Sequence, residues 1–319
     1  MALDPDLEGF LELAQLSRLS GKSRPLQDFG VERARHEFEQ TSQVLDSAPP
    51  AGVSVQTLSI PCRDGQAMPA RLYRDENASD GASPVVLYLH GGGYVVGSLD
   101  SHDAVCRRLA AVSGHAVLAP AYRLAPEHPF PTAVHDSLDA ANWLAEQGPS
   151  LEIDTGAVFF AGDSVGATLA TVLAITAVEQ PQALALKPRG QLLFYPVTDA
   201  SRERNSHTQY DEGYLLETDT LRWFYRHYAG QTEARHDWRM SPLLAHPHRP
   251  IAPALVSLAQ YDPLHDEGLA YAEHLRTLGT EVTLNVEAGL THDFLRMGGI
   301  TERAHAIYAA VAAWLAEHR

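Results

Sequence analysis

The stretch VFFAGDSVGATLA, residues 158–170, constrains the fold more than any other part of the chain. Its apolar, β-forming residues run into Gly162, and small and aliphatic residues with good helix propensity follow Gly166, so the pattern predicts a strand, a sharp turn and a helix. Glycines at these two positions let strand and helix pass closely, while Ser164 takes a strained backbone conformation that projects its hydroxyl outward. The turn has the form of a nucleophile elbow, in which free N–H groups at the helix start favour a negative oxygen.

Length and composition limit the classes of function. No linker rich in Pro, Gly or Ser splits the 319 residues, so we expect one domain with a lid-like addition. The net charge of −16 argues against nucleic acid and anionic membranes as partners. Cys62 and Cys106 stand in unrelated contexts and predict neither a disulfide framework nor a metal site. Without the basic, apolar start of a signal peptide, the protein is expected to be cytoplasmic, and we expect no metal or cofactor.

Strand-like and helical patterns alternate along most of the chain. Strands are predicted at 53–60, 68–73, 85–89, 116–119, 158–161, 192–195, 254–258 and 282–286. Helices are predicted at 101–112, 133–146, 165–178, 267–278 and 301–318. This alternation predicts an α/β fold with an eight-stranded, mostly parallel sheet flanked by helices, and with ligands at the carboxyl ends of the strands. The first two strands are too close for a crossover helix and should pair antiparallel.

Two segments do not fit this alternation. Residues 1–48 have a helical, amphipathic pattern before any strand, and 199–240 holds no clear strand but many aromatic residues. We therefore expect a catalytic domain from 49–198 and 241–319. Residues 1–48 could be a surface appendage or half of a lid, and 199–240 is expected to be an insertion over the active edge of the sheet. The aromatic residues of the insertion could line a substrate pocket or form the cap's own core, and both readings stay open: Tyr210, Tyr214, Trp223, Phe224 and Tyr225.

A second glycine motif supports acyl-transfer chemistry. The strand at 85–89 runs into His90-Gly91-Gly92-Gly93, whose backbone N–H groups can point into one concavity because no side chains block the approach. Together with the N–H of Val165, they could form an oxyanion hole. A flexible turn is the alternative if this motif is taken by itself.

A serine nucleophile needs a base and an orienting acid, in the chain order Ser, Asp or Glu, His. Asp262 lies just past a strand end and is preferred over Asp266, which with Glu267 is expected to open the next helix. His292 is the histidine that follows the last strand, at the edge of the sheet where loop residues face a site.

With these motifs in order, the chain resembles the hormone-sensitive-lipase-like (bacterial family IV) carboxylesterases of the α/β-hydrolase superfamily. The resemblance covers nearly everything from about residue 50 and also includes Tyr122–Glu127, Tyr195-Pro196-Val197, Asp262-Pro263-Leu264 and His292-Asp293-Phe294. It implies a triad of Ser164, Asp262 and His292 and an oxyanion hole from Gly91, Gly92 and Val165. It also implies a helical cap built from 1–48 and 199–240, and a homodimer through the edge of the last strand. We expect the substrate pocket to involve Tyr94, Asp163, Tyr195, Leu215 and Phe294.

The chain also departs from the family pattern. Val165 and Ala167 are bulkier than the usual Ala and Gly, which should narrow the space beside the acyl group. Asp293 replaces a common Gly, and we expect its side chain to point to solvent. Arg123 and Glu127 are expected to be ion-paired supports.

The predicted activity is hydrolysis of small, short- to medium-chain carboxylic esters through an acyl-enzyme. An amidase, lactonase or deacetylase would share the same triad, because such enzymes differ in pocket shape. A receptor without catalysis is the remaining alternative, although it would have little reason to keep all three triad residues.

Overall fold

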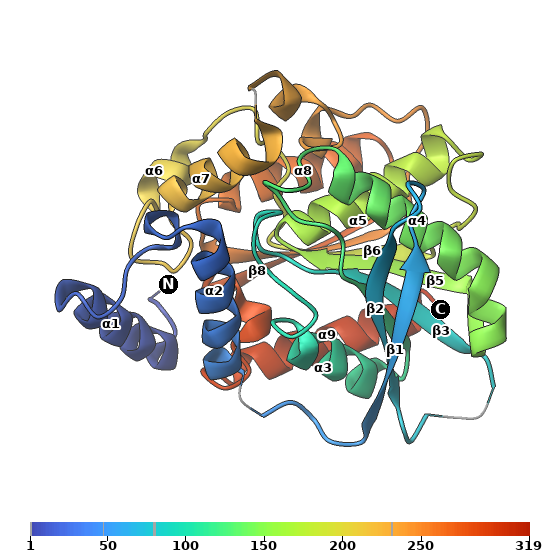
Figure 1. Ribbon diagram of the computed structural model, residues 1–319, viewed down its shortest axis with the longest axis horizontal. Coiled ribbons are helices and arrows are strands. Elements are labelled where there is room, and N and C mark those ends of the chain that lie inside the picture. Colours follow the sequence, from blue (N-terminus) through green and yellow to red (C-terminus); the bar gives the residue numbers. More distant parts are fainter. Residues whose placement is uncertain (1, 47, 79–80, 231) are drawn as a thin grey trace.

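A twisted sheet of eight strands crosses the computed structural model, which describes residues 2–46, 48–78, 81–230 and 232–319 (Figure 1). The strands are β1 Val53–Pro61, β2 Ala67–Asp75, β3 Ser83–Leu89, β4 Ala116–Pro120, β5 Ile153–Asp163, β6 Gly190–Phe194, β7 Ala254–Tyr261 and β8 Val282–Thr291. Their order in the sheet is β1-β2-β4-β3-β5-β6-β7-β8. β2 pairs antiparallel with β1 and β4, and all other pairs are parallel. The predicted eight-stranded, mostly parallel sheet and its antiparallel first pair are confirmed.

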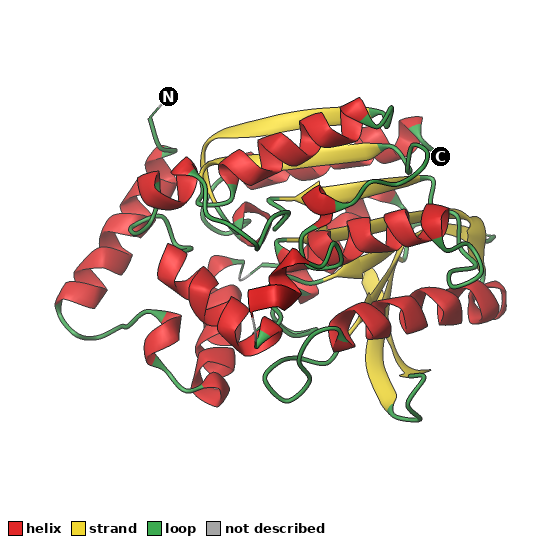
Figure 2. Cartoon of the chain, turned by 90° about the horizontal axis from the view of Figure 1, so that it is seen from above, coloured by secondary structure: helices red, strands yellow, loops and turns green. Residues whose placement is uncertain are grey.

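Helices cover both faces of the sheet, as the view from above shows (Figure 2). The helices α3 Asp103–Ser113 and α9 Arg303–Glu317 lie on one face, and α4 Thr132–Gln147, α5 Val165–Glu179 and α8 His265–Thr277 on the other. Each of the five predicted helices is present, with ends shifted by at most two residues.

Strand β3 lies in the middle of the sheet and is covered on both faces, which explains its almost wholly apolar sequence. Val85, Leu87 and Leu89 face the core beneath α4, α5 and α8. Val86 and Tyr88 face the core beneath α3 and α9. Because successive side chains point to opposite faces and both faces are covered, every position of this strand after Ser83 is buried.

The first helices and the insertion lie on the same side of the molecule (Figure 1). The N-terminal segment forms α1 Pro5–Leu19, η1 Leu26–Asp28 and α2 Val31–Leu45. The insertion forms α6 Asn205–Gln209, α7 Thr218–Ala229 and η3 Thr232–His236, and no strand occurs in its described residues. The predicted N-terminal segment 1–48 also includes residues 1 and 47, which lie outside the described residues.

Hydrogen bonds join these two segments, although they are about 200 residues apart in sequence. Arg18 of α1 forms an ion pair with the buried carboxylate of Glu217. Gln27 donates to the same carboxylate at 3.3 Å and accepts from the hydroxyl of Thr220 at 2.6 Å. The N-terminal helices are therefore fixed against the start of α7.

Candidate active site

The turn at Ser164 has the strained geometry expected of a nucleophile elbow. Its backbone lies at φ 54° and ψ −121°, between the end of β5 and the start of α5. A residue other than Gly in so sparsely populated a region costs about 1–3 kcal/mol, which the surrounding structure must offset. A Cβ at Gly162 would overlap the backbone of Gly166, and one at Gly166 would overlap the carbonyl oxygen of Leu89. Both glycines are therefore required for the close passage of strand and helix, as predicted.

Asp262 and His292 come together at the ends of neighbouring strands β7 and β8. Nδ1 of His292 lies 2.8 Å from Oδ2 of Asp262, and both side chains are buried. The other carboxylate oxygen of Asp262 accepts the backbone N–H of Leu264 at 2.9 Å. Because an ionised carboxylate can only accept, Nδ1 carries the proton and Nε2 is left as an acceptor.

The electrostatics of His292 favour its charged form. Burial alone would lower the pKa of His292, but the charge of Asp262 and its hydrogen bond outweigh burial and raise that pKa above its ordinary value. Such an imidazole can take up a proton and hold it as an imidazolium next to the carboxylate. This is what a general base needs during nucleophilic attack.

The glycine loop places different N–H groups at the site from those that were predicted. The N–H of Gly91 donates to Oδ1 of Asp163 at 2.9 Å, so Gly91 is not available to a substrate. Among the described residues, the N–H groups of Gly92, Gly93 and Val165 have no hydrogen-bond partner, and all three residues border the cavity that contains Ser164. Gly93 therefore replaces Gly91 in the set of free donors, and Gly92 and Val165 stay in it.

Asp163 is a support of this loop and does not line the cavity, contrary to the prediction. Its buried carboxylate also accepts from the hydroxyl of Tyr88 at 2.6 Å and lies 3.3 Å from Nε2 of His102. Burial alone would raise the pKa of Asp163, but the charge and hydrogen bond of His102 hold it below its ordinary value. The carboxylate thus stays ionised and holds the Gly91 amide.

A cavity of about 510 Å³ opens in front of Ser164 and His292. Of the five residues predicted at the substrate pocket, Leu215 borders this cavity, and the other four do not. Tyr94 instead stacks on Tyr228 with ring centroids 3.8 Å apart. Tyr195 lies behind the site, 4.5 Å from the His292 ring and 4.7 Å from the Phe294 ring. Tyr94, Tyr195 and Phe294 are fully buried.

Most of the wall comes from segments that the sequence motifs do not mark. From α2 come Arg33, Glu37, Phe38, Thr41 and Leu45, and from α7 come Thr220, Leu221, Phe224 and Tyr225. Arg33, Glu37, Thr41 and Leu45 recur every four residues, and Phe38 lies three before Thr41. This is the spacing of one helix face, and it is the signal that could have identified them. Of the five aromatic residues left open, Phe224 and Tyr225 border the cavity. Tyr210 and Tyr214 instead pack on Tyr261, and Trp223 packs on His227.

The side chain of Asp293 does not point freely to solvent, so that prediction was wrong. Its carboxylate accepts from Arg296 at 2.6 Å, and Arg296 is buried. Asp293 has φ 69°, a left-handed conformation that an Asp tolerates better than most residues. The pair lies in the cavity wall next to His292.

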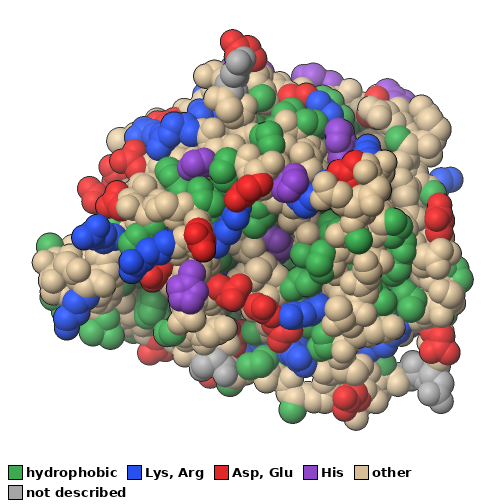
Figure 3. Space-filling model, in the orientation of Figure 1, with side chains coloured by type: hydrophobic (Ala, Val, Ile, Leu, Met, Phe, Trp, Pro, Cys, Tyr) green, Lys and Arg blue, Asp and Glu red, His purple; other side chains and the backbone are tan. Residues whose placement is uncertain are grey.

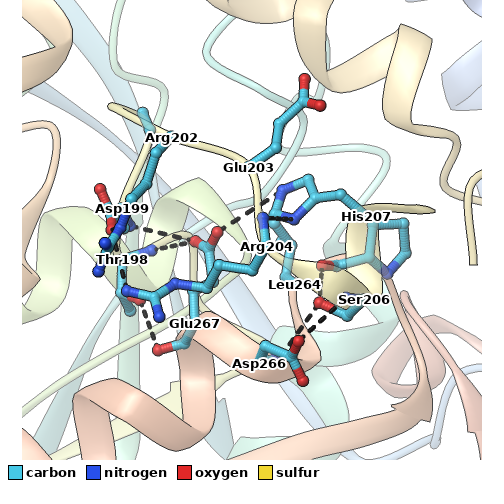
Figure 4. Close-up of polar contacts among 12 residues, drawn as sticks. Thr198, Asp199, Arg202, Glu203, Arg204, Ser206, His207, Leu264, Asp266 and Glu267 are labelled. Atoms are coloured by element: carbon cyan, nitrogen blue, oxygen red, sulfur yellow. Dashed lines mark hydrogen bonds and ion pairs between the residues drawn. The ribbon is translucent and has the colours of Figure 1, made fainter. Parts of the chain in front are cut away.

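Asp266 and Glu267, the other acids near Asp262, accept hydrogen bonds from backbone N–H groups at the start of the insertion (Figure 4). Oε1 of Glu267 accepts the backbone N–H groups of Thr198 at 2.6 Å and Asp199 at 3.2 Å. Asp266 accepts the N–H of Ser206 at 3.0 Å. Both acids lie in the first turn of α8, as predicted. Burial raises the pKa of Glu267 to about 8.

Two further clusters of charged groups are structural. Arg123 donates to both oxygens of Asp136, at 2.9 and 2.6 Å, and Glu127 accepts from Arg35 at 2.6 Å, which confirms the predicted ion pairs. Cys62 lies within reach of Asp136 and Asp139, but Arg123 and Arg63 occupy these carboxylates.

The chain is similar in sequence and in structure to known hydrolases. A family profile described as the alpha/beta hydrolase fold matches residues 86–296. Ethyl acetate hydrolase of Pseudomonas putida is 47% identical over the full length of both chains. The carboxylic ester hydrolase LipN of Mycobacterium tuberculosis is 36% identical, over 98% of this chain and 83% of its own. A solved ester hydrolase from the metagenome of Lake Arreo superposes with a TM-score of 0.93, at 32% identity over 99% of each chain.

Within the described part of the chain, none of the helices combines the length and apolar character that crossing a membrane requires.

Proposed function

Because the chain belongs to the α/β-hydrolase fold family, in its hormone-sensitive-lipase-like group, and is a carboxylesterase, we propose that Ser164, His292 and Asp262 are its catalytic triad. The observation that carries the proposal is the 2.8 Å contact between His292 and Asp262, in a cavity that also contains the strained Ser164.

The proposed reaction begins when Nε2 of His292 accepts the hydroxyl proton of Ser164 as Oγ attacks the ester carbonyl carbon. Asp262 keeps Nδ1 protonated and stabilises the imidazolium. The imidazolium then gives its proton to the departing alkoxide, so an alcohol leaves and an acyl-enzyme remains. In the second half, Nε2 of His292 takes a proton from water as the water oxygen attacks the acyl carbon. The imidazolium then returns this proton to Oγ of Ser164 as the bond between Oγ and the acyl carbon breaks, which releases the carboxylic acid and the free serine.

The negative oxygen of each tetrahedral intermediate needs donors that are already oriented. We assign this role to the N–H groups of Gly92, Gly93 and Val165, which are without partners among the described residues and border the cavity. The start of α5 adds the positive end of a helix dipole at the same place.

The N-terminal helices and the insertion form the proposed cap, over a catalytic domain made of 49–198 and 241–319. Its support is that α2 and α7 supply the outer wall of the cavity. A cavity of about 510 Å³ has room for short- to medium-chain esters. The Val165 side chain next to the nucleophile restricts the acyl side further.

The protein is proposed to act in the cytoplasm, with a small-molecule ester as its partner. A homodimer through β8 is also proposed, because β8 lies at one end of the strand order and Val286 is 43% exposed on it. Sedimentation equilibrium of the wild type and Val286→Glu tests this: the account expects a dimer that the substitution weakens, and a wild-type monomer contradicts it.

Hydrolysis of p-nitrophenyl acetate, butyrate and laurate by the wild type and by Ser164→Ala tests the proposed activity. The wild type should turn over acetate and butyrate faster than laurate, and Ser164→Ala should lose roughly three to six orders of magnitude in kcat. Equal rates for both proteins would overturn the triad, and a rate that rises toward laurate would overturn the chain-length assignment.

A further inference from the structure

The wall of the catalytic cavity has a different charge balance from the rest of the chain. Five cationic side chains border it, against two acidic ones, Glu37 and Asp293. The cationic residues are Arg18, Lys22, Arg24, Arg33 and Arg296. The whole chain, by contrast, has a net charge of −16. An excess of positive charge at the cavity is therefore a local feature and does not follow from composition.

Three of the five cations have partners. Arg296 is paired with Asp293 at 2.6 Å, and Arg33 with Glu37 at 3.3 Å, both within the wall. Arg18 is paired with Glu217, a carboxylate behind the wall. These pairs largely cancel in charge, because the opposite charges lie within ion-pair distance.

Lys22 and Arg24 remain without a partner. Both are exposed, and neither side chain makes an ion pair or hydrogen bond with any described residue. They lie in the loop between α1 and η1, where Gly21 turns the chain at φ 71°. In Figure 3, Lys and Arg side chains lie among Asp and Glu side chains on the side of the molecule where α1 and α2 lie. Two unpaired cations thus face the entrance of a cavity that leads to Ser164.

We propose that the enzyme prefers esters that carry a carboxylate group, and that Lys22 and Arg24 determine this preference. The inference rests on the proposed function, because it concerns substrates of the same cavity. Cations at the mouth of a cleft with low-dielectric walls concentrate anionic ligands and raise their rate of association. A neutral ester gains nothing from them. The substrate class is therefore a half-ester of a dicarboxylic acid or the acyl ester of a hydroxy acid.

Two pairs of substrates isolate the charge. Monoethyl adipate and ethyl hexanoate share the scissile bond and chain length, and differ in a terminal carboxylate against a methyl group. The pair 5-acetoxypentanoate and pentyl acetate places the same difference on the alcohol side. Hydrolysis is followed by pH-stat titration, and the readout is the ratio of kcat/KM for the anionic ester to that for its neutral analogue.

The test variant is Lys22→Gln/Arg24→Gln, and its matched control is Lys187→Gln/Arg249→Gln. The control removes the same two charges from exposed residues that do not border the cavity. In the test variant the anionic-to-neutral ratio should fall about 3- to 10-fold for at least one pair, as expected for two exposed charges. The control should keep the wild-type ratio. Added salt should lower the wild-type ratio toward that of the test variant.

Failure of the inference can be told apart from failure of the proposed function. If the neutral esters are hydrolysed and the ratio is the same in wild type, test variant and control, the inference is wrong and the esterase mechanism stands. An equal fall of the anionic-to-neutral ratio in both variants would also overturn the inference, because the net charge of the protein, and not the two cations at the cavity entrance, would then be the cause. If no ester of either pair is hydrolysed, the proposed function fails and the inference with it.

Discussion

Burial and nearby carboxylates have opposite effects on the pKa of His292, and single substitutions can separate these effects. Its pKa is raised because the Asp262 carboxylate outweighs burial, with smaller contributions from Asp293 and Asp163. As a general base it must be neutral before it takes the proton of Ser164. A raised pKa therefore places the acid limb of kcat/KM above the ordinary titration range of histidine.

Asp262→Asn should lower kcat by about 10³- to 10⁴-fold, since the imidazole loses the carboxylate that fixes its tautomer. The residual activity should have its acid limb at lower pH, because the pKa of His292 falls with the loss of the negative charge. A pH–rate profile measures both effects. Asp266→Asn is the control, because its carboxylate contacts Ser206 and not His292. Full activity in Asp262→Asn would contradict the assignment of the acid.

Asp293→Asn should move the acid limb in the same direction, by less, and keep kcat within about tenfold of the wild type. Two effects add here: the substitution removes a negative charge that raises the pKa of His292, and it leaves the buried Arg296 without its partner. The exposed Asp211→Asn serves as the control in the same pH–rate measurement. A shift of the limb to higher pH would show that this reading of the Asp293–Arg296 pair is wrong.

Between elements, Glu267 joins the first turn of α8 to the start of the insertion (Figure 4). Its folded pKa is about 8 against an ordinary value of 4.5, so the folded protein holds a proton that the unfolded chain releases between these values. Stability from this group is complete below about pH 4.5 and is lost as the pH rises toward 8, by up to about 1.4 kcal/mol per pH unit.

Glu267→Gln should therefore flatten the pH dependence of unfolding relative to the wild type between pH 5 and 8. Urea unfolding across that range gives the free energy at each pH. Glu273→Gln, on the exposed face of the same helix, should behave as the wild type does. Parallel curves for wild type and Glu267→Gln would mean that Glu267 ionises normally in the folded protein.

The glycine loop also touches the proposed cap directly. Gly93 has φ 61°, and a Cβ there would overlap the ring of Phe224 on α7. Gly93→Ala should reduce kcat/KM, because the loop that carries the proposed oxyanion donors must move. The loss should be smaller when Phe224→Ala is present as well, and a double-mutant cycle measures this coupling. Strictly additive losses would rule out the contact as the cause.

At the scale of the whole molecule, patterns of short period were enough to predict most of the fold. The eight strands and the positions of Ser164, Asp262 and His292 at strand ends follow from apolar runs broken by Gly and Pro, because a parallel sheet collects its loops at one edge. The ion pairs of Arg123 and Glu127 were also correct. These features depend on residues near one another in sequence or on one repeated architecture.

What could not be predicted depends on contacts between distant segments. Gly91 and Gly93 look alike in the motif, and it is the hydrogen bond donated by the Gly91 N–H to Asp163 that removes Gly91 from the free donors. Part of the cavity wall comes from the N-terminal segment, which the ion pair of Arg18 with Glu217 joins to the start of α7, and no local pattern encodes that pair. Asp293 is the exception, because its partner Arg296 is only three residues away; the turn at φ 69° that brings the two side chains together is marked by no sequence pattern.

The central claim is that one serine is the nucleophile, and covalent labelling with diethyl 4-nitrophenyl phosphate tests it most directly. The account predicts one diethylphosphoryl group per chain, found by peptide mass spectrometry on Ser164, with activity lost in proportion to labelling and no label in Ser164→Ala. Complete inactivation with the label on another residue, or full labelling with unchanged activity, would contradict the account.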